Sequence, residues 1–346
     1  MDNKENIFTM FDEGYLSCSE IFSDTIPAKS TAQTYQKTYP KVLQVKAQID
    51  KTLTSDDRVL TNMIKNENRY LPSHPDYFRS VQIEIKPHMR KIVSDWMLEV
   101  CQELCCQPEV FCLAMNLMDR FLARCRIIKS QLQLLGAVCL FLSSKFKETA
   151  PIPSEKLVMY TDFSVTLEEI REWELIVLHK LKWDLCSSTA LDYLDHIIPR
   201  LIIHPSVDHA KLRRQTETII ALTSTQYLFS YVRPSVIASS AIAVSLRCLL
   251  PNFSEDGARQ FLTSLQTFSR ANTTDLEACS SAMIQTLPSY LTTAVTSDPS
   301  PPSPSPSSTS SSTPSTPNNQ NTNFSADLNS SLPLQGSFQH MMVKSC

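Results

Sequence analysis

The chain has 346 residues, of which 42% are apolar and 19% are charged, so it is long enough for two domains with tails and for a substantial core. Its 32 Lys and Arg residues are balanced by 35 Asp and Glu residues, which gives a net charge of -3. No basic excess is present to drive binding to phosphate groups, and we expect no nucleic-acid partner.

The cysteine content bears on the compartment and on metal binding. The chain has 11 cysteines, an odd number, and no signal peptide is recognised, which favours free thiols in a reducing compartment. Its densest cluster, Cys101, Cys105 and Cys106, has neither a CxxC spacing nor a second pair of ligands. We therefore predict that these cysteines are buried apolar residues and that no metal is bound.

Enzyme motifs and membrane segments are not found in the sequence. Four glycines occur in the whole chain, whereas loops that cradle phosphate groups need several close together. The HExxH and GxSxG patterns do not occur, and the longest apolar run, residues 132–142, is too short to span a bilayer. We expect no catalytic residues, no cofactor and no membrane partner.

Helical periodicity begins at Ile83 and continues to about Ala294. In residues 89–104 the apolar positions recur every three or four residues, which predicts an amphipathic helix behind Pro87. Similarly, Pro108 predicts the start of a second helix that runs to about residue 123.

The third predicted helix, residues 131–146, is apolar around most of its circumference, so we expect it to be enclosed by other helices. The small residues Gly136 and Ala137 at its centre would let a neighbouring helix cross closely. A short fourth helix is predicted after Pro153. A fifth is predicted over residues 166–182, with Thr166 and Glu169 spaced as a capping box.

The same scheme is repeated in the second half of the chain. Residues 234–250 are again apolar around most of the helix, with small residues at the centre, about 100 residues after the first central helix. The predicted fold class is therefore all-α, with two tandem five-helix units.

The C-terminal sequence, residues 295–346, is rich in Pro, Ser and Thr and is predicted to be disordered. Either a flexible linker or a phosphorylated regulatory tail fits this composition. The candidate phosphorylation sites directly precede prolines: Ser300, Ser303, Ser305, Thr313 and Thr316.

A short pattern near the N-terminus, LSCSE in residues 16–20, has the geometry of a binding motif. The side chains of Leu16, Cys18, Glu20 and Phe22 recur at two-residue intervals, so an extended chain would present all of them on one face. The alternative is that the pattern arose by chance.

Several long segments, in order, resemble the cyclin box: MRKIVSDWMLEVC, MNLMDRFL, LQLLGAVCLFLSSKFKE and EWELIVLHKLKWDL. The KLKWDL ending and the SSKFKET turn are similar to D-type cyclins in particular. The resemblance implies an N-terminal cyclin box over residues 55–185 and a C-terminal cyclin-fold repeat over residues 186–294. It leaves residues 1–54 as a flexible segment with the Leu-x-Cys-x-Glu motif, and residues 295–346 as the tail.

The resemblance also implies roles for individual residues. Kinase-binding residues would be Lys145, Phe146, Glu148 and Glu174. A substrate-docking groove would be formed by Met89, Ile92, Val93, Trp96, Glu99, Leu132 and Gln133. A buried ion pair would join Arg90 to Asp119, and a pocket protein of the retinoblastoma family would bind Leu16, Cys18, Glu20 and Phe22.

The residue pattern by itself supports plainer alternatives for the implied sites. Lys145 would complement the negative end of a helix, Glu174 would be a solvated charge, and the groove residues would be core. In addition, Lys147 stands where many cyclins have an acidic residue, and Val93 is smaller than the Leu common in other cyclin classes.

The function implied by the resemblance is that of a regulatory subunit. It would activate a G1-class cyclin-dependent kinase, recruit a retinoblastoma-family pocket protein for phosphorylation and promote the G1/S transition, in the nucleus and cytoplasm. Whether kinase-inhibitor proteins join the complex is left open. The alternative is a cyclin-fold transcription factor or transcriptional cyclin that acts as a scaffold, although no zinc ribbon or basic repeat is found; an enzyme is the third possibility.

Overall fold

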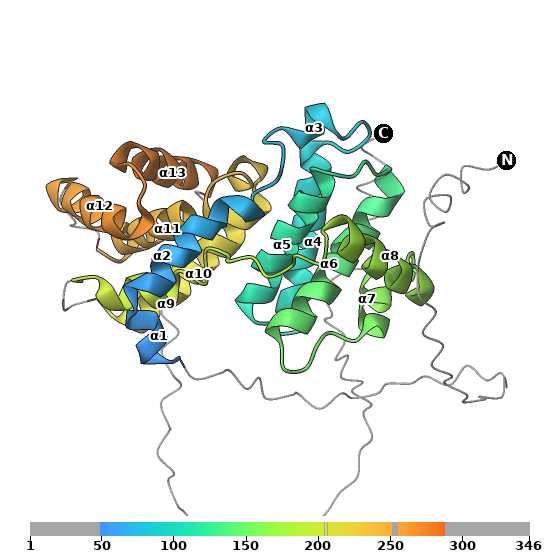
Figure 1. The fold of residues 1–346 in the computed structure, drawn as a ribbon, viewed down its shortest axis with the longest axis horizontal. Helices are drawn as coiled ribbons and strands as arrows, with labels where there is room; N and C mark the ends of the chain where they lie inside the picture. Colours follow the sequence, from blue (N-terminus) through green and yellow to red (C-terminus); the bar gives the residue numbers. More distant parts are fainter. Residues whose placement is uncertain (1–48, 204, 206, 251–254, 288–346) are drawn as a thin grey trace, which may run out of the picture. The chain divides into compact units, whose positions relative to one another are not determined.

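The computed structural model describes residues 49–203, 205, 207–250 and 255–287, all within one compact unit (Figure 1). Every regular element in these ranges is a helix, so the predicted all-α class is confirmed. None of the described helices has both the length and the apolar character needed to cross a bilayer.

The described chain begins with helices that precede the first five-helix unit. The side chain of Asp50 accepts a hydrogen bond from the amide of Thr52, and that of Asp56 accepts one from the amide of Arg58, so each acid caps the start of a helix. The elements are α1 (Lys51–Ser55), α2 (Asp57–Glu67), η2 (Asn68–Tyr70) and α3 (Tyr77–Ser80).

The first five-helix unit follows the predicted order. Prolines occupy the first turn of its first two helices, and the capping box of Thr166 and Glu169 is present at the start of α8, as predicted. Its elements are α4 (Pro87–Glu103), α5 (Pro108–Leu122), η3 (Lys129–Gln131), α6 (Leu132–Lys147), α7 (Ser154–Tyr160) and α8 (Leu167–Lys180).

Helix α6 is the central element of this unit and packs against α4, α5 and α8. A Cβ atom placed on Gly136 would lie 2.9 Å from Cγ1 of Val93 and 3.2 Å from Sδ of Met97, so only glycine permits this approach of α4. The predicted close crossing at Gly136 is confirmed.

The second unit repeats the arrangement around α11, which packs against α10, α12 and α13. The buried residues of this central helix include the small side chains Ala238, Ser239 and Ala241. The elements are α9 (Leu194–Ile197), η4 (Ile198–Arg200), α10 (His209–Thr225), η5 (Tyr227–Phe229), α11 (Pro234–Leu249), α12 (Glu255–Ser269) and α13 (Thr273–Thr286).

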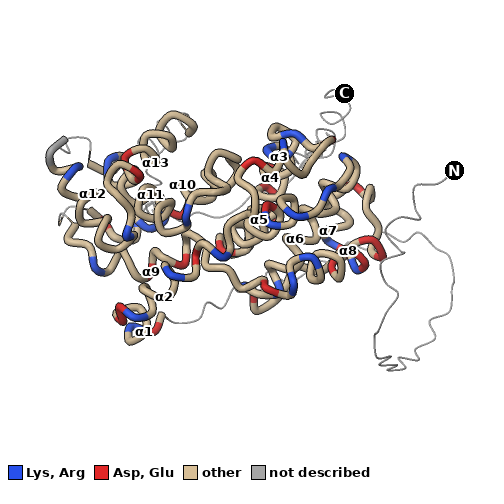
Figure 2. Tube along the Cα trace, turned by 45° about the horizontal axis from the view of Figure 1, so that its top comes forward, with Lys and Arg blue, Asp and Glu red and all other residues tan. Residues whose placement is uncertain are grey.

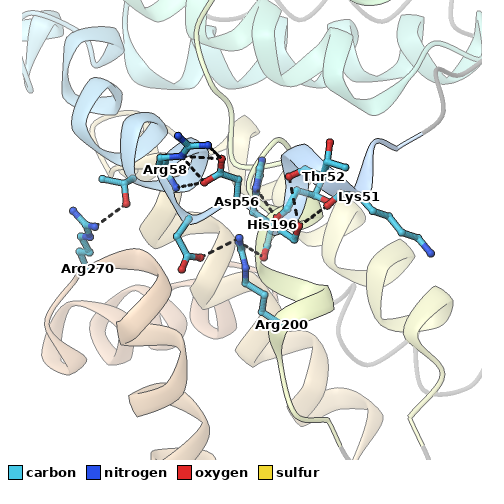
Figure 3. Close-up of polar contacts among 11 residues, drawn as sticks. Lys51, Thr52, Asp56, Arg58, His196, Arg200 and Arg270 are labelled. Atoms are coloured by element: carbon cyan, nitrogen blue, oxygen red, sulfur yellow. Dashed lines mark hydrogen bonds and ion pairs between the residues drawn. The ribbon is translucent and has the colours of Figure 1, made fainter.

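The helices α1 and α2 dock on the second unit, although they precede the first unit in the sequence (Figures 1 and 3). Polar contacts from second-unit residues reach both helices. His196 Nδ1 lies 3.2 Å from the carbonyl oxygen of Thr54, Arg200 pairs with Asp57 at 3.2 Å, and Arg270 donates to Thr61 Oγ1 at 2.9 Å.

The buried end of α2 also contacts the second unit, through Glu67. The Glu67 carboxylate accepts hydrogen bonds from the amide of Ser235 at 3.0 Å and from its hydroxyl at 2.9 Å. Tyr193 donates at 3.2 Å and Arg233 at 3.3 Å. Because Ser235 lies in the first turn of α11, this buried carboxylate caps that helix and complements its dipole.

Candidate functional site

The candidate site lies where the C-terminal end of α6 meets α8. Lys145 Nζ is 2.6 Å from Glu174 Oε1, and the same ammonium group lies 3.8 Å from the centroid of the Phe141 ring. The side chain of Lys145 is 39% exposed and that of Glu174 is 18% exposed. The structure therefore brings two of the predicted kinase-binding residues together, in a pair that solvent and a partner can reach.

Two exposed apolar side chains lie on the same helices as this pair. Phe146, predicted as a binding residue, is 53% exposed, and Leu175, for which no role was predicted, is 61% exposed. The buried stripe of α8 includes Ile170 and Val177. Leu175 falls off that stripe, and an apolar residue on the polar face of an amphipathic helix is the signal that could have identified it.

Glu148 and Lys147, at the end of α6, make intramolecular contacts. Glu148 Oε1 accepts a hydrogen bond from the amide of Gln107 at 2.7 Å and so satisfies a donor at the start of α5. Lys147 Nζ lies 3.0 Å from Oδ1 of Asp192, beyond α8 in the chain. The local charge pairing of Lys147, which the sequence left open, is therefore to Asp192.

The predicted groove residues divide into a buried layer and a surface layer. Met89, Val93 and Leu132 are buried in the core beneath the surface. Exposed or partly exposed are Ile92, Trp96, Glu99 and Gln133. Trp96 Nε1 donates to the carbonyl oxygen of Tyr160 at 3.2 Å, and Gln133 Oε1 lies 3.4 Å from Ser164 Oγ. Because Val93 is buried against Gly136, the size of its side chain affects the close packing of α4 on α6 before it affects the depth of a groove.

The ion pair implied by the resemblance is present and buried. Arg90 donates to both carboxylate oxygens of Asp119 at 2.7 Å, and the Tyr77 hydroxyl donates to Asp119 Oδ1 at 2.8 Å. Arg90 also donates to the carbonyl oxygens of Thr225 at 2.9 Å and Ser224 at 3.2 Å, at the end of α10. Burial and the neighbouring Asp119 carboxylate raise the pKa of Tyr77 well above its ordinary value.

The cysteine cluster departs from its prediction. Cys101 is buried, but Cys105 is exposed and Cys106 is half-buried, so the prediction of burial is wrong for Cys105. The reason is local: α4 ends at Glu103, and Cys105 follows it with φ of 53°, in the left-handed turn that closes the helix. Among the described residues no group of three potential ligands could hold a metal ion.

Two predicted sites lie outside the described residues. They are the pocket-protein motif, with Leu16, Cys18, Glu20 and Phe22, and the tail sites Ser300, Ser303, Ser305, Thr313 and Thr316. Within the described helices, Figure 2 shows basic and acidic residues interspersed, including along α8, in agreement with the balanced charge of the chain.

Comparison with known proteins places the chain in a family. Residues 58–186 match the family "Cyclin, N-terminal domain" and residues 188–313 match "Cyclin, C-terminal domain". The G1/S-specific cyclin-D2 of Xenopus laevis is 48% identical over 201 residues, which are 58% of this chain and 68% of that protein. The chain belongs to the D-type cyclins. The G1/S-specific cyclin-D1 of Danio rerio is 50% identical over 194 residues, 56% of this chain and 66% of that protein.

A solved structure supports the fold of this D-type cyclin independently. A viral cyclin from herpesvirus saimiri superposes with a TM-score of 0.54 at 24% identity, over 65% of this chain and 98% of that chain. At this identity the likeness concerns the fold alone. In the cyclin frame, the pair of Lys145 and Glu174 joins the third and fifth helices of the first repeat, which are α6 and α8.

Proposed function

We propose that this D-type cyclin is a regulatory subunit that binds and activates a G1-class cyclin-dependent kinase and thereby promotes the G1/S transition. The observation that carries the proposal is the accessible pair of Lys145 and Glu174, with exposed Phe146 and Leu175 on the same two helices. Apolar side chains beside a positioned charge pair are the composition of a protein-docking surface.

The energetics of the pair favour a role in binding over a role in folding. A partly exposed Lys–Glu pair contributes about 0–1 kcal/mol to stability, because solvent screens it and both side chains lose entropy. When a partner covers the pair and excludes water, the same charges act at a lower effective dielectric constant. Their interaction with the partner is then stronger, and a partner with mismatched charges is rejected. Phe146 and Leu175 would supply the apolar area that is buried on binding. Lys145 and Glu174 would fix the orientation of the bound partner.

The proposed mechanism requires no catalytic group from the cyclin. A protein kinase is active when its own Lys–Glu ion pair and its metal site are aligned, and both depend on the position of one mobile helix. A rigid surface that binds that helix in its active position shifts the population of kinase conformations toward the active one. The packing of α6 among α4, α5 and α8 supports such rigidity.

The test is the substitution Lys145→Glu, which places two acids opposite each other across α6 and α8. We expect a folded protein by circular dichroism and a loss of at least about tenfold in affinity for a purified G1-class cyclin-dependent kinase, because close like charges cost more than 1 kcal/mol once covered. The control is Lys86→Glu, which makes the same change of net charge at an exposed residue at the start of α4. Equal affinity of Lys145→Glu and the control would refute this surface.

A swapped pair separates binding from folding. Lys145→Glu combined with Glu174→Lys restores an ion pair between α6 and α8 but reverses its polarity. If the pair only held the helices together, the swap would restore kinase activation to the level of the unmodified protein. We expect kinase activation to stay low, because the partner would meet each charge in the wrong place.

Recruitment of a retinoblastoma-family pocket protein is the second part of the proposal, and it is supported by the spacing of Leu16, Cys18, Glu20 and Phe22. Cys18→Gly with Glu20→Lys should abolish pocket-protein capture in a pulldown and leave kinase capture unchanged. Retained capture would mean that LSCSE arose by chance. Joint loss of the kinase would mean that the segment is part of the folded unit.

Regulation through the tail and residence in nucleus and cytoplasm complete the proposal. The support for regulation is compositional, because each of the five Ser or Thr sites directly precedes a proline, which is the arrangement that proline-directed kinases recognise; the residence is carried over from the resemblance to D-type cyclins. Phosphopeptide mass spectrometry of the protein from dividing cells, combined with cell fractionation, tests both points. Unmodified tail peptides throughout the cycle would contradict regulation at these sites.

A further inference from the structure

A cleft of about 570 Å³ opens between the two repeats, where the end of α4 and the start of α5 face α10. Helix α10 packs against both α4 and α5 and supplies the second-repeat wall of the cleft. Its walls are mainly apolar and include Leu98, Phe111 and Leu222, and three cysteines line it: Cys101, Cys105 and Cys106. None of the lining residues belongs to α6 or α8, so the cleft does not include Lys145, Phe146, Glu174 or Leu175, although the amide of Gln107 in its wall donates to Glu148 at the end of α6.

The backbone at the end of α4 brings two of these thiols together. The amide of Cys106 donates to the carbonyl oxygen of Cys101 at 2.8 Å, and the amide of Cys105 donates to that of Gln102 at 3.0 Å. With Cys105 in the left-handed region at φ 53°, these two bonds form a Schellman motif. That motif brings the residue after the turn, Cys106, close to the residue three positions before the cap, Cys101, and both residues line the cleft.

The two thiols have unequal acidity. A hydrogen bond from Cys101 lowers the pKa of Cys106, and the Lys156 ammonium adds to this, while burial and the Glu148 carboxylate oppose it. The same hydrogen bond and its own burial raise the pKa of Cys101 well above its ordinary value. These opposite directions make Cys106 the more acidic thiol of the pair. By contrast, burial raises the pKa of Cys112 to about 12, which leaves that thiol inert.

We propose that Cys106 is a covalent modification site and that the cleft binds soft electrophiles with an apolar body, of the α,β-unsaturated carbonyl class. The cleft volume falls in the range of small-molecule sites, about 300–1,000 Å³. The apolar walls would cover the hydrocarbon chain of such a compound. Near them, Gln102 and Arg214 line the cleft with groups able to donate a hydrogen bond to its carbonyl oxygen.

The reaction balances without an oxidant or a leaving group. The Cys106 thiol releases its proton to water, and the sulfur lone pair forms a bond to the β carbon of the electrophile. The electrons of the C=C bond move toward the carbonyl oxygen and give an enolate, which takes a proton from water at the α carbon. The net change is addition of the thiol across the double bond. The hydrogen bond from Cys101 stabilises the attacking thiolate, which is the reactive form of cysteine.

The first experiment uses 4-hydroxynon-2-enal, an enal with an apolar chain, at substoichiometric concentration and pH 7, with each modified cysteine quantified by peptide mass spectrometry. We expect Cys106 to react about tenfold faster than Cys105 and Cys186, although both of those residues are exposed. Faster reaction at either exposed cysteine would overturn the proposal, because accessibility alone would then decide the site.

A matched pair of variants tests the thiol contact. Cys101→Ala removes the hydrogen-bond donor, whereas Cys101→Ser keeps a donor of nearly the same size. We expect the reaction at Cys106 to slow about tenfold in Cys101→Ala and less than threefold in Cys101→Ser, with unchanged circular dichroism in both. Equal rates in the two variants would show that Cys101 does not activate Cys106.

A third variant tests the cleft. Thr218→Trp adds a large side chain at an exposed position of α10 that lines the cleft. We expect it to slow the reaction of Cys106 with the nonenal about tenfold and to leave its reaction with small iodoacetamide within twofold. An unchanged rate with the nonenal, or equal slowing with both reagents, would overturn the assignment of the cleft as the binding site.

Discussion

At the scale of single residues, the ion pair of Arg90 and Asp119 places two charges in the core of the described chain. Both side chains are almost fully buried, and protein atoms serve as their hydrogen-bond partners. The Tyr77 hydroxyl donates to Asp119, and the carbonyl oxygen of Thr225 accepts from Arg90. Charges taken out of water are tolerated only when they are paired in this way. Removing one partner therefore costs far more than an exposed pair contributes.

The first prediction concerns this pair. Asp119→Ala should lower the free energy of unfolding by about 3–5 kcal/mol, because it leaves the Arg90 guanidinium buried without its counter-ion. Urea denaturation followed by circular dichroism measures the change. The control is Asp56→Ala, whose ion pair with exposed Arg58 is screened by solvent, so the variant should lose little more than its helix cap and clearly less stability than Asp119→Ala. Equal losses in the two variants would contradict this account.

At the scale of secondary-structure elements, Glu67 shows how a helix before the first repeat is fixed to the second. Both of its carboxylate oxygens accept hydrogen bonds, and every group that faces them is a donor. An ionised carboxylate only accepts, so it fits this site in a way that an amide of equal size does not. The negative charge also lies at the start of α11, where the helix dipole stabilises it.

The second prediction is that Glu67→Gln destabilises the protein by about 1.5–3 kcal/mol, since the amide nitrogen would face donors and the hydrogen bonds to a charged group would be lost. Limited proteolysis should then cut within residues 49–67 before it cuts the repeats. The control is Asp57→Asn on the same helix, which removes a pair whose acid is almost fully exposed and should change stability by less than about 1 kcal/mol. Unchanged protection of α2 in Glu67→Gln would argue against this role of the carboxylate.

Much of the helical architecture follows from local sequence. Apolar periodicity and two prolines predicted α4 and α5, the spacing of Thr166 and Glu169 predicted the cap of α8, and Gly136 predicted a close crossing. These features depend on neighbours within a few residues, and the sequence carries them directly.

The contacts between distant segments could not be predicted in the same way. The carboxylate of Glu67 caps a helix 168 residues further along the chain, and nothing in either segment specifies the other. The exposed Cys105 depends on a left-handed turn that a sequence without glycine there does not suggest. The pair of Lys145 and Glu174 came from family resemblance, because two charges 29 residues apart carry no local signal.

At the scale of the whole molecule, the two repeats are joined by polar contacts as well as by packing. Arg90 and Ser94, both on α4, donate to the carbonyl oxygen of Thr225 at the end of α10. Tyr227, just beyond α10, donates to the carbonyl oxygen of Pro75 at 2.6 Å. The buried ion pair of the first repeat thus also satisfies the C-terminal end of a helix in the second. This arrangement predicts that the repeats unfold together.

The third prediction tests that coupling with a variant that keeps each core filled. Arg90→Met with Asp119→Leu removes both buried charges and replaces them with apolar side chains, so it should be less destabilised than Asp119→Ala. It also removes the guanidinium that links α4 to α10. We expect the unmodified protein to show one calorimetric transition whose van't Hoff and calorimetric enthalpies agree, and the double variant to show two transitions or a clear mismatch between these enthalpies.

Tyr227→Phe is the matched control, because it removes one cross-repeat hydrogen bond near the surface and leaves Arg90 in place, and it should retain a single transition. A single transition in the double variant would show that apolar packing between α5 and α10 is sufficient to couple the repeats, and that Arg90 acts within the first repeat alone.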